Sequence, residues 1–115
     1  MICALLLALT ISVVNPFIGS GGHGHVFVGA DVPHGQVHAG PMNTTLGWDW
    51  CSGYHASDST FAGFAQTRLG GTGVADYGDI VIRPQLTSAF DPSEHFLKST
   101  EECTPGYYSV TISDG

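Results

Sequence analysis

A nine-residue segment carries the densest set of chemically active side chains in the sequence. Residues 47–55 read GWDWCSGYH and include Trp48, Asp49, Trp50 and His55. An indole face stacks on the apolar C–H face of a pyranose ring, while carboxylate and imidazole groups bond to the ring's hydroxyls. The segment therefore indicates a sugar-binding site. The sequence alone equally allows a structural role, in which both tryptophans point into the core and Asp49 caps a turn.

A glycine-rich segment near the start of the chain is a second candidate. Residues 19–25 read GSGGHGH and include Gly21, Gly22 and His23. The glycines match the spacing of a dinucleotide-binding loop, but that loop opens a helix, and the VFVGADVPHG that follows cannot start one. We therefore interpret the segment as a loop whose backbone approaches another group closely. His23 and His25 alternate on one face, but they are an incomplete metal-ligand set, and hydrogen-bonded loop histidines are commoner.

Four aspartates in the middle of the chain raise the question of glycoside hydrolysis: Asp49, Asp58, Asp76 and Asp79. Inverting glycosidases hold two carboxyl groups about 6.5–9.5 Å apart around the bond that they cleave. Nothing in the sequence shows which pair, if any, faces a pocket. The spacing of Asp76 and Asp79 is more typical of a turn before a strand than of a catalytic or calcium-binding pair.

The charge distribution excludes several classes of partner. The net charge is −7, and the basic residues are Arg68, Arg83 and Lys98, so residues 1–67 contain none. Nucleic acids and anionic membrane surfaces attract clustered bases, and a Walker-type phosphate loop needs its lysine. We therefore expect no nucleic-acid partner and no membrane partner. A neutral or cationic ligand, or a metal, remains.

The elements that position these residues are expected to be strands and loops. Of the 115 residues, 16 are glycine and only 11% are charged, which disfavours a helical bundle or a coiled coil. Short strands are indicated by the buried-type apolar run at 80–82, the alternating apolar residues of 108–112 and the phenylalanines of 61–64. We predict an all-β fold, a partial antiparallel β-sandwich, in one domain or part of one.

The first residues resemble a secretory signal. Residues 1–14 read MICALLLALTISVV, which is too short for a membrane span of about 20 residues. A cleavage after Ser12 fits, so we expect residues 1–12 to be a signal peptide and residues 13–115 to be secreted or periplasmic. The alternative is a plain N-terminal strand.

Two further signals bear on an oxidising compartment. Without the leader, Cys51 and Cys103 remain, and they could form one disulfide. Residues 43–45 read NTT, which is a glycosylation sequon that matters only in a eukaryotic secretory route.

Four segments, in order, carry a resemblance to a known family. They are VNPFIGSGGHGHVFVGADVPHG (14–35), WDWCSGYHASDSTFAGF (48–64), LGGTGVADYGDIVIRP (69–84) and PGYYSVTISD (105–114). Together they resemble the start of glycoside hydrolase family 92, whose members are calcium-dependent exo-acting α-mannosidases. WDWCSGYH is an unusual octapeptide, and the resemblance spans nearly all of the chain after the leader.

The resemblance implies an N-terminal β-sandwich packed against a larger α/α barrel, with the active site between them. It implies inversion at the anomeric carbon and a calcium ion that holds the mannose hydroxyls. The family's acid and base carboxylates lie in the barrel, so no residue of this chain is expected to be catalytic or to be a metal ligand. Trp48, Asp49, Trp50 and His55 then become substrate-binding residues, and the loop Gly21-Gly22-His23 is a second contribution to the sugar pocket.

The chain departs from the family's pattern at several positions. The family often reads FSHTHLSGTG where residues 64–73 read FAQTRLGGTG, so Gln66 and Arg68 replace two histidines. His34 replaces a phenylalanine, and Cys103 stands where an alanine is common. The sequence DPSE at 91–94, taken alone, could start a helix. The resemblance instead predicts a loop or a turn of helix over residues 91–104.

We therefore expect the N-terminal fragment of a secreted, inverting exo-α-mannosidase of α-1,2 type. It would remove terminal mannose from glycans and would need a C-terminal α/α barrel domain that this sequence lacks. The sequence ends at a turn signal, SDG, as expected inside a larger protein. The alternatives are a non-catalytic carbohydrate-binding β-sandwich module and a structural β-domain without a ligand.

Overall fold

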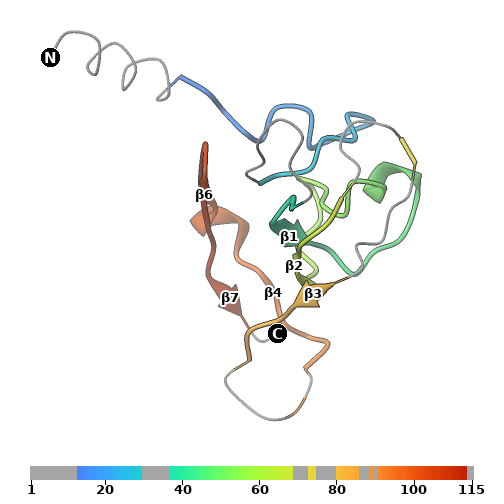
Figure 1. Cartoon of the computed structure of the whole chain (residues 1–115). Helices are drawn as coiled ribbons and strands as arrows, with labels where there is room; N and C mark the ends of the chain where they lie inside the picture. The colour runs from blue at the N-terminus through green and yellow to red at the C-terminus, as the bar shows by residue number, and fades with distance from the viewer. Residues whose placement is uncertain are drawn as a thin grey trace, which may run out of the picture.

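The protein folds into short antiparallel strands joined by long loops (Figure 1). The computed structural model describes residues 13–29, 37–68, 73–74, 80–85, 89 and 91–113, so the leader, His34, Asp76 and Asp79 lie outside the described residues. Within the described ranges, regular structure consists of strands and two single turns of 3-10 helix, and all strand pairings are antiparallel. The predicted all-β antiparallel fold is therefore confirmed. No helix among these residues has the length and apolar character needed to cross a membrane.

A three-stranded sheet forms the first layer. It contains β1 (Gly40–Met42), β2 (Gly63–Ala65) and β3 (Val81–Ile82), in the order β1-β2-β3. Gly63 has a φ of 142°, and a Cβ at this position would lie 2.8 Å from the carbonyl oxygen of Ile82. Glycine is therefore required where β2 passes β3. The strand predicted from the phenylalanines of 61–64 is confirmed as β2.

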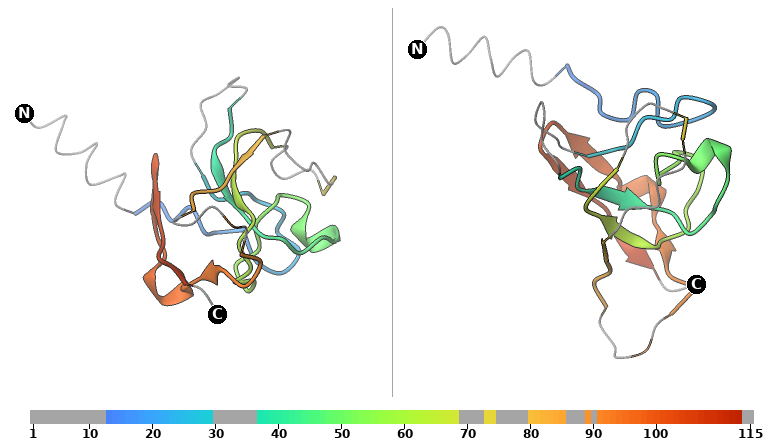
Figure 2. Two further views of the ribbon diagram at one scale, coloured as in Figure 1. Left: turned by 90° about the horizontal axis from the view of Figure 1, so that it is seen from below. Right: turned by 45° about the vertical axis from the view of Figure 1, so that its right-hand side comes forward.

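The C-terminal strands, orange and red in Figure 2, lie beside this sheet. Strand β4 (His95–Phe96) pairs with β7 (Ile112–Ser113), and β5 (Glu102–Thr104) pairs with β6 (Tyr107–Ser109) in a hairpin. A single 3-10 turn, η2 (Lys98–Thr100), connects β4 to β5. The alternating segment 108–112 thus contributes to two strands with different partners, β6 and β7.

The DPSE sequence forms a turn and not a helix. The carboxylate of Asp91 accepts hydrogen bonds from the backbone N–H and the hydroxyl of Ser93, at 2.8 and 2.6 Å. Asp91 therefore closes a local turn, and β4 begins two residues later. The only helical structure within residues 91–104, all of which the structure describes, is the single turn η2, which lies between strands β4 and β5. The resemblance was therefore right to predict a turn of helix here and not a long helix.

The core is small and aromatic. Phe61, Phe96 and Tyr54 are buried, and their rings meet edge to face, with centroids 5.0 Å apart for Phe61–Phe96 and 6.4 Å for Tyr54–Phe96. The prediction that the run Ile80–Ile82 is buried is wrong, because its side chains are 40–57% exposed. Strand β3 ends the order of its sheet, and the described residues leave its side chains open on both faces.

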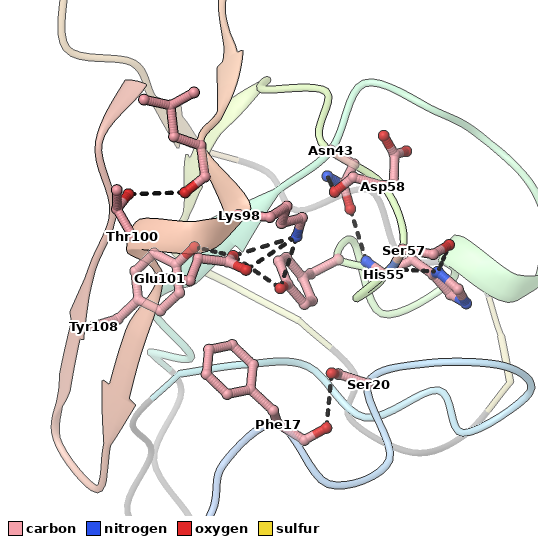
Figure 3. Close-up of polar contacts among 12 residues, drawn as sticks. Phe17, Ser20, Asn43, His55, Ser57, Asp58, Lys98, Thr100, Glu101 and Tyr108 are labelled. Carbon is pink, nitrogen blue, oxygen red and sulfur yellow. Dashed lines mark hydrogen bonds and ion pairs between the residues drawn. The ribbon is translucent and has the colours of Figure 1, made fainter. Parts of the chain in front are cut away.

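A partly buried polar network ties the C-terminal hairpin to the rest of the fold (Figure 3). Tyr54 and Tyr108 donate hydrogen bonds to Glu101 at 2.8 and 2.6 Å, and Lys98 donates to the hydroxyl of Tyr54 at 2.8 Å. Burial, and then the hydrogen bond to Glu101, raises the pKa of both tyrosines, so both stay protonated donors. Because Tyr54 belongs to the aromatic segment 47–55, the network anchors that segment to η2 and β6.

Replacing the shared acceptor should loosen this anchor. We expect Glu101→Gln to lower the free energy of unfolding by about 1–2 kcal/mol, because the amide accepts less strongly and leaves the part-buried Lys98 without its counter-charge. Urea denaturation measures the change, with the exposed Glu102→Gln as a matched control. Equal stability of both variants would show that the network does not hold the hairpin.

Candidate functional site

The aromatic segment folds as a tight loop around one 3-10 turn, η1 (Trp48–Trp50). The N–H of Trp50 donates to the Gly47 carbonyl at 3.1 Å, and the N–H of Gly53 donates to the Trp50 carbonyl at 2.8 Å. Gly53 has a φ of 83°, and a Cβ there would overlap the guanidinium of Arg68. The glycine therefore both ends the turn and lets the buried Arg68 pack against the backbone of the loop.

The two tryptophans of η1 have different environments. Trp48 is 60% exposed, so the alternative that both tryptophans point into the core is wrong for this residue. Trp50 is half-buried, and its indole N–H donates to a carboxylate oxygen of Asp58 at 2.8 Å. Its ring packs against that of His55, with the ring centroids 4.9 Å apart. The open aromatic face of the segment is therefore that of Trp48, and Trp50 anchors the turn.

Asp49 joins the aromatic segment to the glycine-rich loop. Its Oδ1 lies 2.5 Å from Nδ1 of His23 and 3.7 Å from Nε2 of His25. The hydrogen bond with His23 holds the pKa of Asp49 below its ordinary value, and His25 contributes in the same direction. The carboxylate is therefore ionised at neutral pH, and it can accept hydrogen bonds from a ligand hydroxyl.

His55 makes a second connection between the two loops. Its Nδ1 accepts from the backbone N–H of Ser57 at 3.3 Å and lies 2.9 Å from the Ser57 hydroxyl, which is visible in Figure 3. Its Nε2 lies 3.1 Å from the carbonyl oxygen of Gly22. Because Nδ1 accepts, Nε2 carries the proton and donates to Gly22, so the ring is the neutral Nε2–H tautomer. His55 is buried, and its ring supports the site from behind.

The glycine-rich segment forms a compact loop without a following helix. The N–H of Gly24 donates to the Gly21 carbonyl at 3.2 Å, and the N–H of Val26 donates to Gly19 at 3.1 Å. A Cβ at Gly24 would overlap the Gly19 carbonyl oxygen, so the loop closes on itself only with glycine there. This confirms a close backbone approach, and the described residues after the loop show no dinucleotide-binding helix.

The structure thus brings together the residues that the sequence analysis selected. They lie on two loops that touch through Asp49–His23, His55–Gly22 and a backbone bond from Ala56 to Ser20: Gly21, Gly22, His23, Trp48, Asp49, Trp50 and His55. Trp48, Asp49 and His23 share the open face, since the rings of His23 and Trp48 are 5.2 Å apart. Asn43, His25 and Asp58 also contact these residues, although they were not predicted as site residues from the sequence.

Asn43 is the buried centre of the loop behind the site. Its amide donates to the carbonyls of Asp58 and Thr60 at 3.2 and 2.8 Å. Its oxygen accepts from the N–H of His55 at 2.7 Å, a bond drawn in Figure 3. Its side chain is 1% exposed, so the sequon that begins here does not present its asparagine for glycosylation in the folded chain. Asn43 instead has a structural role, because its side chain holds the turn that contains His55, Asp58 and Thr60.

Asp58 completes that turn as an ionised acceptor. Burial raises its pKa, but hydrogen bonds from Thr45, Thr60 and Trp50 outweigh burial and leave the pKa below its ordinary value. Its carboxylate is thus committed to internal donors, including the indole N–H of Trp50 at 2.8 Å. Asp58 is a support of Trp50, with its acceptor capacity largely used inside the protein.

The described residues do not gather a calcium site. Within them, no group of three or more histidine, cysteine, aspartate or glutamate side chains could hold a metal ion. Calcium takes six to eight oxygen ligands, far more than Asp49 alone offers. Cys51 and Cys103 are free thiols in this structure, so the disulfide that the sequence allowed is not formed.

Comparison with known proteins gives the family context. A family model described as the glycosyl hydrolase family 92 N-terminal domain matches residues 13–115. The chain is 25% identical over 113 residues to an uncharacterized secreted glycosidase from Arthroderma benhamiae, covering 89% of this chain and 14% of the fungal protein. The chain therefore spans only about one seventh of that relative.

Solved structures similar to this chain belong to the same family. The fold is similar to that of a family GH92 α-mannosidase from Bacteroides thetaiotaomicron, solved in complex with mannoimidazole, with a TM-score of 0.72 and 32% identity. A second structure of the same bacterial enzyme gives a TM-score of 0.71. Both matches cover 87% of this chain and 15% of the enzyme. The chain belongs to glycosyl hydrolase family 92, whose N-terminal domain it matches over residues 13–115.

Proposed function

We propose that this chain is the N-terminal part of an exo-α-mannosidase and that it contributes one wall of the pocket for a terminal mannose. The observation that carries the proposal is the exposed Trp48 beside the hydrogen-bonded pair His23–Asp49, in a chain of family 92. The bacterial neighbour is an α-mannosidase solved with mannoimidazole, which supports a mannose-like ligand.

In this proposal each exposed group has a separate task. The indole of Trp48 stacks on the C–H face of the sugar ring, and the ionised Asp49 accepts a hydrogen bond from a ring hydroxyl. Trp50 and His55 hold these two groups from behind, through Asp58 and Gly22. Gly21, Gly22 and His23 bring the second loop against the sugar. The protein thus supplies orientation and binding here.

The reaction itself is assigned to the rest of the enzyme. Inverting hydrolysis needs a protonated acid and an ionised base, whereas the pKa of Asp49 and that of Asp58 are both lowered. We propose that both catalytic carboxylates and the calcium ligands lie in the C-terminal α/α barrel, and that the substrates are mannose-containing glycans with terminal α-1,2 linkages. The family resemblance supports these points.

The proposed location is outside the cytoplasm. We propose that residues 1–12 are a signal peptide and that residues 13–115 are the start of a β-sandwich domain, secreted or periplasmic. The apolar composition of the leader supports this, and so does the fungal relative, which is described as secreted.

A non-catalytic carbohydrate-binding module is the second candidate. The open face offers an aromatic platform and hydrogen-bonding groups, while its carboxylate, Asp49, is held in the ionised form and cannot act as a proton donor. Binding without turnover by the longer polypeptide that contains this chain would favour this candidate over the mannosidase.

The test is a substitution at the open aromatic face. In the longer enzyme, we expect Trp48→Ala to lower kcat/KM for an α-mannoside by about 10- to 100-fold, which is the usual range for one lost pocket contact. Trp48→Phe, which keeps an aromatic face, should recover most of the loss. The melting temperature should change little, because Trp48 is exposed. Full activity of Trp48→Ala would remove the sugar-stacking role.

A further inference from the structure

His25 lies beneath the open face, where three segments of the chain meet. Its side chain is 8% exposed, and its ring meets that of Trp48 edge to face, at 4.2 Å between centroids and 80° between planes. Gly73 closes the third side, since a Cβ there would lie 3.3 Å from Nδ1 of His25 and 3.7 Å from Nε1 of Trp48. The imidazole of His25 is therefore enclosed by the chain, and the indole of Trp48 packs against it.

The backbone of His25 has a conformation that is uncommon for residues other than glycine. Its φ is 54°, and among the described residues it is the one non-glycine residue with a positive φ. A glycine would adopt this conformation at less cost, and Gly24 directly precedes it in the sequence. The loop geometry alone would favour glycine at this position. The presence of an imidazole at residue 25 therefore indicates a role for the side chain itself.

The position of Nε2 in the His25 ring indicates what this role is. Nε2 is buried and makes no hydrogen bond within the described residues, yet it lies 3.7 Å from Oδ1 of Asp49. The same oxygen is 2.5 Å from Nδ1 of His23, whose side chain is 73% exposed. Asp49 therefore lies between an outer, solvent-exposed imidazole at hydrogen-bond distance and an inner, buried imidazole at 3.7 Å, which is just too far for a hydrogen bond.

We propose that His25 is a positioning residue of the sugar site. It supports the indole of Trp48 from below, and it becomes the hydrogen-bond partner of Asp49 when a sugar hydroxyl takes the place of His23. A small inward shift of the carboxylate would bring Oδ1, now 3.7 Å from Nε2 of His25, to hydrogen-bond distance. The second lone pair of Oδ1, which His23 now uses, is then left for the sugar hydroxyl. The inference rests on the proposed sugar-binding role and adds a residue that acts through Trp48 and Asp49.

The decisive variant of the 115-residue chain is His25→Gly, because glycine keeps the positive φ while removing the ring. We expect its unfolding midpoint to fall only modestly, because relief of the positive φ partly offsets the loss of the buried ring. We expect the Trp48 indole Nε1–H to become mobile in ¹⁵N relaxation measurements made without sugar. Affinity for methyl α-mannoside, measured by titration, should fall about tenfold, which is about 1.4 kcal/mol. His95→Ala, in strand β4, is the histidine control and should change neither the mobility of the Trp48 indole nor the affinity.

The two readouts separate this inference from the proposed function. If the original chain does not bind the mannoside, the proposed function fails in this chain, and the sugar-free mobility of Trp48 still decides whether His25 positions it. Unchanged mobility in His25→Gly overturns the inference. So does unchanged affinity when the original chain binds. A double-mutant cycle with Asp49→Asn should give non-additive losses, and additive losses would show that His25 does not act through Asp49.

Discussion

The chain on its own is expected to hydrolyse no detectable aryl α-mannoside, even with calcium present. A glycosidase needs one carboxyl group that stays protonated near neutral pH, which requires a raised pKa. At this site the pKa of Asp49 is lowered and not raised, because its carboxylate is hydrogen-bonded to His23. Asp58 is also ionised and bonded to the indole of Trp50. Neither aspartate can donate the proton that the leaving oxygen needs.

The measurement compares residues 13–115 with a longer enzyme that includes the barrel domain. Loss of both the acid and the base should lower turnover by far more than a hundredfold, because each contributes about 10²–10⁴ in rate. The chain should still bind methyl α-mannoside, which separates binding from chemistry. Turnover within about a hundredfold of the longer enzyme, abolished by Asp49→Asn, would place the chemistry in this chain and refute the assignment.

The two tryptophans show what the sequence could and could not establish. Their spacing of two residues places them on one face if the segment is a strand. In a 3-10 turn, with three residues per turn, the same spacing sends them in different directions. The composition of residues 47–55 was therefore enough to select the segment as a candidate site, but only the turn η1 shows that Trp48 is open and Trp50 is anchored.

Other differences between the sequence-based expectations and the structure also arise from contacts between distant parts of the chain. The run Ile80–Ile82 has the composition of a buried strand, but burial depends on a covering layer that the described residues do not provide. The sequon at Asn43 is a local pattern, and the burial of its side chain follows from contacts with residues 12–17 positions away. The positive φ of His25 likewise has no sequence signal, because only a small share of non-glycine residues adopts this conformation and no local pattern marks which ones do.

Replacing Asn43 should destabilise the chain more than any other single polar substitution proposed above. Asn43→Ala removes three hydrogen bonds and leaves the N–H of His55 and the carbonyls of Asp58 and Thr60 without a side-chain partner. Each unsatisfied buried group costs about 1–3 kcal/mol, so we expect the free energy of unfolding to fall by about 3–5 kcal/mol. This is a large part of the 5–15 kcal/mol typical of a domain.

Chemical denaturation measures this loss, and Asn15→Ala is the matched control. Asn15 is exposed and caps only the N–H of Phe17, at 2.9 Å, so its loss should cost less than about 1 kcal/mol. Asn43→Asp keeps the acceptor for His55 but cannot donate to the two carbonyls, and the charge that it buries is unpaired. It should therefore be no more stable than Asn43→Ala. Equal stability of the Asn43 and Asn15 variants would mean that the turn behind Trp50 and His55 is held by other contacts, and that the aromatic segment does not depend on Asn43 for its position.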